Sequence, residues 1–302
     1  MATIAERAVT APEVGWELRP APSFLRRWGR HAVQNPAGAL GLLIVVGFVI
    51  IGIIGPSIVP YDPKGIDASA RYEGPSSEHW FGTTDLGLDI FSRVLKGARV
   101  SLLFGLIVVF LGFLPGSFLG ILSGYAGRWV DYVIQRSGEA WTAFPQLPLF
   151  LAFITAFGRG LDTIAIVVAI GAIFGGSRLL RAVALIEKHQ EYVMAARSLG
   201  ARESRVLFRH ILPNIMPYII VGLSSVFAIA ILAEAALSFL GLGLETGEPG
   251  WGNDLSAARD FGRTHPHMVI FPGLAISVVV FGFNMLGDAL RDILDPRLRG
   301  SR

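Results

Sequence analysis

The stretch from Val100 to Ser123, VSLLFGLIVVFLGFLPGSFLGILS, contains no Asp, Glu, Lys or Arg. An α-helix rises about 1.5 Å per residue, so roughly 20 apolar residues cross a hydrocarbon core about 30 Å thick. Lipid offers no hydrogen-bond partner to a bare backbone, and a single segment satisfies its own backbone only as a helix. The stretch therefore predicts a membrane-spanning helix.

Five other runs share this freedom from charged residues. The run at 163–177 is short, but Arg178 at its end can extend its side chain toward the membrane surface. Only 16% of the chain is charged, against about 25% in soluble domains. The five further runs are 37–59, 140–158, 163–177, 211–233 and 268–287. We therefore predict an all-α integral membrane protein with six transmembrane helices.

The distribution of Lys and Arg predicts an orientation. With the N-terminus inside, the inside segments hold 18 of the 26 Lys and Arg residues and the outside segments hold 8. Cytoplasmic loops of membrane proteins carry the excess of these residues, so we expect both termini in the cytoplasm. The run at 37–59 follows 36 residues and is longer than the core of a signal peptide, so we expect a retained helix.

The composition excludes several kinds of chemistry. The chain has no cysteine, its six histidines lack the spacing of a metal site, and no Gly-x4-Gly-Lys-Ser/Thr phosphate loop is present. We therefore expect no metal or cofactor bound by this chain and no ATP hydrolysis of its own. A membrane-embedded enzyme would need a catalytic constellation, and a stand-alone secondary transporter would need carboxylates deep in several spans. Neither pattern occurs.

The loop between the fourth and fifth runs is the most informative feature. It reads LIEKHQEYVMAARSLGARESRVLFRHILPN from Leu185 to Asn214. Tyr192, Ala195, Ala196 and Leu199 form one apolar stripe at helical spacing, Gly200 interrupts it, and Arg and Lys occupy the other face. A broken basic helix pair of this kind suits docking into a groove on a partner, and it suits an anionic lipid surface equally well.

The loop resembles the signature loop of binding-protein-dependent ABC importer permeases, which has the form Glu-Ala-Ala-x3-Gly-x9-Ile-x-Leu-Pro. Ala195, Ala196 and Gly200 fall on that pattern, as does the Leu-Pro pair at 212–213. Met194 stands where the family has Glu, and His210 where the general pattern has Ile. The His resembles one branch of the family, the peptide/nickel-type importers.

Three further stretches resemble the C-type permease of that branch, and together the likeness covers roughly residues 35 to 299. They are HWFGTTDLGLDIFSRVLKGARVSL at 79–102, ILAEAALSFLGLG at 231–243 followed by WGNDL, and GDALRDILDPRLR at 287–299. Arg136, Glu139 and Pro145 also match an Arg-x-x-Asp-x5-Pro pattern, with Glu replacing Asp.

The resemblance implies a fold and a set of partners. We expect a type I permease with a five-helix core and one additional N-terminal helix. The expected partners are a second permease of the same family, two ATP-binding subunits that carry the ATP and Mg²⁺, and an extracytoplasmic substrate-binding protein. The implied segments are a cytoplasmic segment at 1–36, a first helix at 37–59, an external loop at 60–97, a core at 98–290 with a coupling loop at 185–213, and a cytoplasmic tail at 291–302.

The resemblance also implies a transport function with site residues. The chain would translocate di- or oligopeptides by alternating access in a bacterial or archaeal inner membrane; nickel chelates, glutathione, opines or oligosaccharides are the alternative cargoes. Glu234, Arg136, Glu139 and Pro145 are gating or structural candidates, and Asp85, Asp89 and Arg93 are candidates for contact with the binding protein or for local caps and ion pairs. The expected ATPase-coupling residues are Glu191, Ala195, Ala196, Arg197, Leu199, Gly200, Arg205, His210, Leu212 and Pro213.

Overall fold

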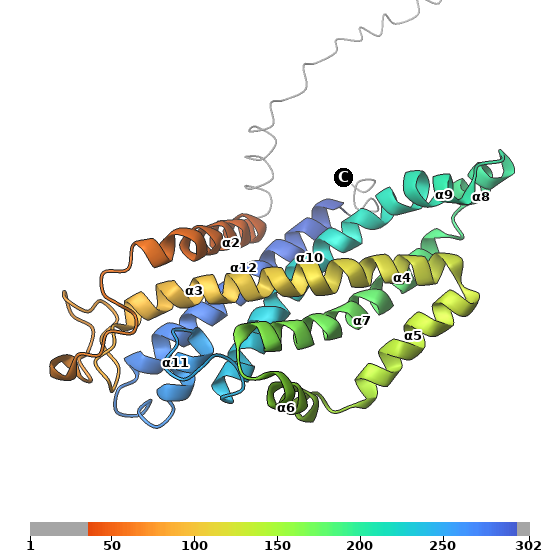
Figure 1. Ribbon diagram of the computed structural model, residues 1–302. Helices are drawn as coiled ribbons and strands as arrows, with labels where there is room; N and C mark the ends of the chain where they lie inside the picture. The colour runs from red at the N-terminus through yellow and green to blue at the C-terminus, as the bar shows by residue number, and fades with distance from the viewer. Residues whose placement is uncertain (1–35, 295–302) are drawn as a thin grey trace, which may run out of the picture.

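A computed structural model describes residues 36–294 of the protein and contains helices without any strand in that range. The predicted cytoplasmic segment at 1–36 and most of the predicted tail at 291–302 lie outside the described residues. The long helices α2, α3, α4, α7, α10 and α12 run roughly side by side along one axis (Figure 1). The short helices α8 (Glu191–Ser198) and α9 (Glu203–Val206) lie at one end of the bundle, and α11 (Trp251–Ala257) lies at the other.

Five helical stretches are long and apolar enough to cross a membrane, which confirms five of the six predicted spans. The two longest, 90–126 and 203–239, each measure about 55 Å at 1.5 Å per residue, so their ends extend beyond the hydrocarbon core. The five stretches are α2 (Pro36–Ile54) with η1 (Gly55–Ser57), α3 (Ile90–Ile107) with η3 (Val108–Phe113) and α4 (Leu114–Ala126), α7 (Leu161–Glu187), α9 with η4 (Leu207–Ile211) and α10 (Leu212–Phe239), and α12 (His267–Leu294).

The remaining predicted span, 140–158, is bent rather than straight, and it makes a sixth span if its two helices cross the membrane together. The two helices are α5 (Arg128–Ala143) and α6 (Gln146–Phe157), and they meet at an angle of 89°. Phe144 between them is extended, with φ −83° and ψ 133°. The ring of a proline pushes the preceding residue out of the helical region, and Pro145 has this effect on Phe144.

Two other prolines are accommodated without a break. Pro115 and Pro213 each lie at the start of an α-helix that follows a π-helical turn, η3 or η4. A proline ring clashes with the carbonyl one turn earlier, and a π turn changes the register there. Pro213 was expected to close the internal loop before the fifth span. The chain instead stays helical from Glu203 to Phe239.

A row of glycines brings α4 and the end of η3 against α7. Gly112, Gly116, Gly120 and Gly124 recur every fourth residue and therefore lie on one helix face. A Cβ atom added at each of them would lie 2.2–2.8 Å from a backbone oxygen of α7, in order those of Ala169, Ile173, Ser177 and Arg181. Small residues at this spacing allow two membrane helices to approach until their backbones touch. We call these four residues the glycine row.

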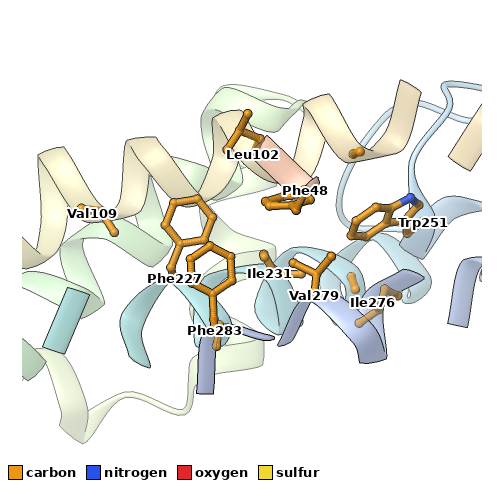
Figure 2. Close-up of a cluster of buried hydrophobic side chains, with 12 residues drawn as sticks. Phe48, Leu102, Val109, Phe227, Ile231, Trp251, Ile276, Val279 and Phe283 are labelled. Carbon is orange, nitrogen blue, oxygen red and sulfur yellow. The ribbon is translucent and has the colours of Figure 1, made fainter. Parts of the chain in front are cut away.

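An aromatic cluster ties the additional first helix to the rest of the bundle (Figure 2). Phe227 of α10 and Phe283 of α12 stack with ring centroids 4.5 Å apart. Phe48 of α2 contacts both rings edge-on and also packs against Trp251 of α11. Aromatic pairs of this geometry contribute about 0.5–1.5 kcal/mol each beyond the area they bury.

The glycine row generates a stability prediction. Gly116→Val places a branched side chain where Ile173 backbone atoms lie 2.2–2.8 Å from the new Cβ, so α4 and α7 must separate. Overpacking of this kind destabilises by about 3 kcal/mol. Thermal unfolding of the detergent-purified protein should show a clear fall in midpoint. Gly47→Val on α2, where no atom lies within 4 Å of the new Cβ, is the matched control and should unfold like the wild type.

Candidate functional site

The hairpin formed by α8, the turn at 199–202 and α9 projects from one end of the bundle (Figure 1). Gly200 has φ +77°. Its N–H donates to the Arg197 carbonyl at 2.9 Å, and the Ala201 N–H donates to the Ala196 carbonyl at 3.1 Å. This pair of bonds is a Schellman motif, which ends a helix with a left-handed residue, usually glycine. The predicted bend at Gly200 is confirmed.

The two faces of α8 differ from the predicted apolar stripe. Val193 and Ala196 are buried in a core cluster with residues of α7 and α10, whereas Met194, Ala195 and Leu199 are exposed. Leu199 is 88% exposed. The expectation that Ala196 lines a docking surface was therefore wrong, because its methyl group faces the bundle. Ala195 and Leu199 remain available to a partner, and Met194 joins them.

The basic residues predicted on the other face of the hairpin also fall into two groups. Arg205 is exposed, as are Arg202 and Arg209. Arg197 instead lies within 3.2 Å of the Glu203 carboxylate and near the ring of Tyr125, with its guanidinium carbon 5.8 Å from the ring centroid. The hydrogen bond to Tyr125 and the charge of Glu203 raise the pKa of Arg197.

The other predicted coupling residues lie along the same hairpin and its junction with α10. Glu191 is exposed in the first turn of α8, and His210 is partly buried in η4. Leu212 packs against the core cluster while Pro213 is exposed. Tyr192 is partly buried and donates to Glu187 at 2.6 Å, and burial followed by this bond raises its pKa to about 12.

A groove of about 1470 Å³ runs along α7 and α10 and is bordered by α5 and α6. Its walls are mostly apolar or small, and many of the side chains that form them, such as Leu179, Tyr218 and Ile229, are exposed in this single chain. Among the described residues that line it, only Glu187 and Arg291 carry a formal charge. The groove is large enough for a small solute, since ligand pockets measure about 300–1,000 Å³.

Glu234 does not line this groove. It is fully buried in α10, where its carboxylate accepts hydrogen bonds from Ser101 of α3 at 3.1 Å and Ser238 at 3.0 Å. Its carboxylate therefore does not reach water. Two hydroxyl donors satisfy the carboxylate and join α3 to α10, so its position fits the predicted structural role better than solute binding.

The bent segment places its three predicted residues on the outside. Arg136 and Glu139 form an i, i+3 ion pair at 2.5 Å, as their spacing predicts, and both side chains are more than half exposed. Pro145 precedes α6 and sets the bend. Their exposure leaves a gating role as a prediction.

A buried ion pair closes the opposite end of the bundle. Arg93 of α3 and Asp254 of α11 lie 2.6 Å apart, and both are almost completely buried. Arg93 also donates to the Pro63 carbonyl at 2.8 Å, which fixes the long loop that precedes α3. Burial raises the pKa of Asp254, and the charge of Arg93 opposes that rise.

The predicted external contact residues divide accordingly. Asp89 caps α3 by accepting from the Ser92 N–H at 2.8 Å, pairs with His79 at 2.9 Å and is 3% exposed. Since Asp89 and Arg93 are both buried, the expectation that they contact a binding protein was wrong. The alternative of a helix cap is confirmed for Asp89, whereas Arg93 pairs with the distant Asp254 and not with a local carboxylate. Asp85 is partly exposed, so the contact stays a prediction for that residue.

Comparison with known proteins identifies the family. The family model of binding-protein-dependent transport system inner membrane components matches residues 116–300. The chain belongs to this family. A second model, the N-terminal transmembrane domain of oligopeptide transport permease C, matches residues 23–75. The protein is therefore a permease subunit of an ABC importer, as its loop predicted, and a multi-pass inner-membrane protein.

Relatives support the same conclusion. The permease is 41% identical over 266 residues to the dipeptide transport system permease protein DppC of Alkalihalophilus pseudofirmus, covering 88% of each chain. It is 41% identical over 273 residues to the glutathione transport system permease protein GsiD of Pectobacterium atrosepticum, covering 90% of each. Its fold resembles a chain of the MetNI methionine ABC transporter in an inward-facing conformation, with a TM-score of 0.55 at 17% identity, covering 67% of this chain and 96% of the other.

Several site residues carry no signal that sequence reasoning used. Asp254 lies three residues after Trp251 in a glycine-rich stretch of sequence, and only its burial against Arg93 distinguishes it from a surface carboxylate. Tyr125 follows the second apolar run and reads as an interfacial aromatic. The four-residue spacing of the glycine row is visible in the sequence and predicts a close helix contact.

The two neighbouring alanines of α8 yield a prediction. Ala196→Glu places a carboxylate in the apolar cluster under the hairpin, and an unpaired buried charge costs about 3–5 kcal/mol. The hairpin should unfold locally, and limited proteolysis should cleave the chain between 190 and 206. Ala195→Glu adds the same charge on the exposed face and should stay within about 0.5 kcal/mol of wild type. Equal protease sensitivity of the two variants would contradict the assigned faces.

Proposed function

We propose that this permease carries di- or oligopeptides into the cell, within an assembly that contains a second permease of the same family, two ATP-binding subunits and an external substrate-binding protein. The observation that carries the proposal is the exposed apolar tip of the α8–α9 hairpin, with Ala195 and Leu199 flanked by exposed arginines. An 88% exposed leucine beyond the membrane-spanning helices is costly in water and suits a partner's groove.

The ATP-binding subunits supply the energy in this proposal. The permease has no phosphate loop of its own, so ATP and Mg²⁺ bind to those subunits and this chain binds no cofactor. Closure of the two ATP-binding subunits moves the docked hairpins, and the helix bundles then open toward the loaded binding protein. The polar residues Glu191, Arg205 and His210 lie on or beside the docked surface.

The second permease completes the solute path. The groove along α7 and α10 is open on one side in a single chain, and its apolar walls are exposed there. A second subunit placed over the groove removes these walls from lipid and converts the groove into an enclosed passage. Its walls carry almost no formal charge, so a solute can pass without strong binding. Weak binding is required of a transport path, because a tightly bound solute would not leave.

The orientation follows from charge. The hairpin and both chain ends lie in the cytoplasm in this proposal, which accounts for the 18-to-8 distribution of Lys and Arg. The α11 end with its long loops then faces outward. Asp85, the partly exposed residue of the three external candidates, is available there to the binding protein.

The cargo is tested in proteoliposomes that contain the complete assembly and its binding protein. Uptake of a radiolabelled dipeptide should require ATP inside and the binding protein outside. Glutathione is the second candidate cargo, favoured by the 41% identical relative named for its transport, and an excess of it in a competition arm separates the two. Solute movement without nucleotide would contradict the ATP-driven mechanism, and ATP-driven uptake of glutathione but not of dipeptides would contradict the peptide assignment alone.

The docking surface generates its own prediction. Leu199→Asp replaces the exposed apolar side chain with a charge that a partner's groove would have to bury, so uptake should fall at least tenfold while membrane insertion is unchanged. Leu199→Met preserves apolar character and should keep most of the activity. For the Asp variant, binding of the ATP-binding subunits, measured by co-purification, should fall in parallel with uptake. Wild-type uptake with Leu199→Asp would contradict the docking assignment.

A further inference from the structure

Tyr125 lies where three segments of the permease meet at the α8–α9 end. It is the penultimate residue of α4, and its hydroxyl hydrogen-bonds to Glu203, both to the carboxylate and, at 3.1 Å, to the backbone carbonyl. Glu203 begins α9, so this contact ties the far arm of the hairpin to the end of α4. Arg197, near the end of α8, also bonds to the Glu203 carboxylate, at 3.2 Å.

Two cations complete the arrangement around the Tyr125 ring. The Arg197 guanidinium carbon lies 5.8 Å from the ring centroid and the Lys188 Nζ lies 5.7 Å from it, both in cation–π range. Lys188 also donates to the Tyr125 carbonyl at 2.6 Å, which satisfies an unpaired carbonyl at the end of α4. The hydroxyl, the ring and the carbonyl of one residue therefore contact both arms of the hairpin and the end of α7. We call Tyr125, Lys188, Arg197 and Glu203 the tyrosine latch.

The latch lies next to the corner that leads into the groove wall. Gly127, two residues after Tyr125, has φ +65° and ends α4, and α5 begins at Arg128. Asp131 in the first turn of α5 pairs with Arg181 of α7 at 2.5 Å, which fixes the start of α5 against the bundle. The far end of α5 contributes Trp141 and Thr142 to the groove.

The hairpin is anchored by apolar burial, to which the Tyr125 ring contributes and the Tyr125 hydroxyl does not. Val193, Ala196 and Val206 anchor α8 and α9 through apolar burial in the cluster shared with α7 and α10. Removing one hydroxyl at Tyr125 leaves that burial intact, so the hairpin can stay folded when the latch is broken.

We propose that Tyr125 is a positioning residue that passes movement of the α8–α9 hairpin to the α4–α5 corner, and through α5 to the wall of the groove. The inference rests on the proposed function, because it assumes that the hairpin moves with the ATP-binding subunits. The hairpin leads directly only into α7 and α10, which precede and follow it in the chain. The tyrosine latch gives it a third connection, to the end of α4 and, past Gly127, to α5, which lines the groove and is not its neighbour in sequence.

The test compares Tyr125→Phe with wild type in the complete assembly in proteoliposomes. The variant keeps the ring and its cation contacts and loses the hydrogen bonds to Glu203. Solute imported per ATP hydrolysed should fall about tenfold, the factor expected for losing a hydrogen bond to a charged group. ATP hydrolysis stimulated by the loaded binding protein should stay within about twofold of wild type. Tyr132→Phe, an exposed tyrosine on α5, is the matched control and should leave the ratio unchanged.

A double variant separates transmission from simple loss of structure. Glu203→Ala removes the carboxylate that Tyr125 and Arg197 share and leaves the Glu203 backbone carbonyl in place, so Tyr125→Phe with Glu203→Ala should lower the ratio by less than the two separate losses combined. A ratio at the wild-type value for Tyr125→Phe, additive losses in the double variant, or parallel loss of uptake and ATP hydrolysis would each overturn the inference.

Hydrogen exchange of the same purified assembly separates this inference from the proposed function. In Tyr125→Phe, amides of 191–206 should exchange about tenfold faster, while those of α2 stay unchanged, whether or not solute is transported. Unchanged exchange in the hairpin would overturn the latch alone. Absence of ATP-driven uptake in the wild-type assembly would overturn the proposed function. It would also overturn the transmission of movement through Tyr125, even if the exchange result shows that Tyr125 holds the hairpin.

Discussion

Backbone contact between α4 and α7 along the glycine row is the constraint on which the rest of the structure depends. Lipid tails are as apolar as leucine, so membrane helices gain little from hydrophobic burial against each other and associate through close packing. Glycines at 112, 116, 120 and 124 leave no side chain between the two backbones over more than three turns. The pair forms a fixed scaffold with one end under the hairpin and one flank along the groove. The other helices are placed relative to it.

Two polar devices close the ends of this scaffold in different ways. At the α11 end, the Arg93–Asp254 pair is almost completely buried and joins two helices far apart in the chain, α3 and α11, so this end is built to stay closed. At the hairpin end, the tyrosine latch is only partly buried and consists of hydrogen bonds and cation–π contacts. Partly exposed polar contacts of this kind are weaker than buried pairs. A rigid α11 end and a releasable hairpin end suit a permease that is driven from one side.

The sequence predicted the spans well because charge-free runs report directly on membrane thickness, and five of six proved to be continuous helices. It did not predict the bend at Phe144 in the run at 140–158, where the effect of Pro145 on its neighbour outweighed the apolar character of the run. On α8, helical spacing grouped Ala195 with Ala196, but residues one apart face different sides and only packing against Val206 and Ile211 decides which is buried. The sequence singled out Asp89, Arg93 and Glu234 as candidate site residues. The burial of Arg93 and Glu234 depends on partners more than 100 residues away in the chain. Such partners are invisible to local patterns.

The central claim is that this chain is half of a solute path and functions only within a mixed assembly. Native mass spectrometry of the complex, purified from its own membrane through a tag on this chain, tests that claim most directly. The account predicts a particle with one copy of this permease, one copy of a different permease of the same family and two ATP-binding subunits. A particle that contains only copies of this chain would contradict it, since the open groove would then be closed by the chain itself.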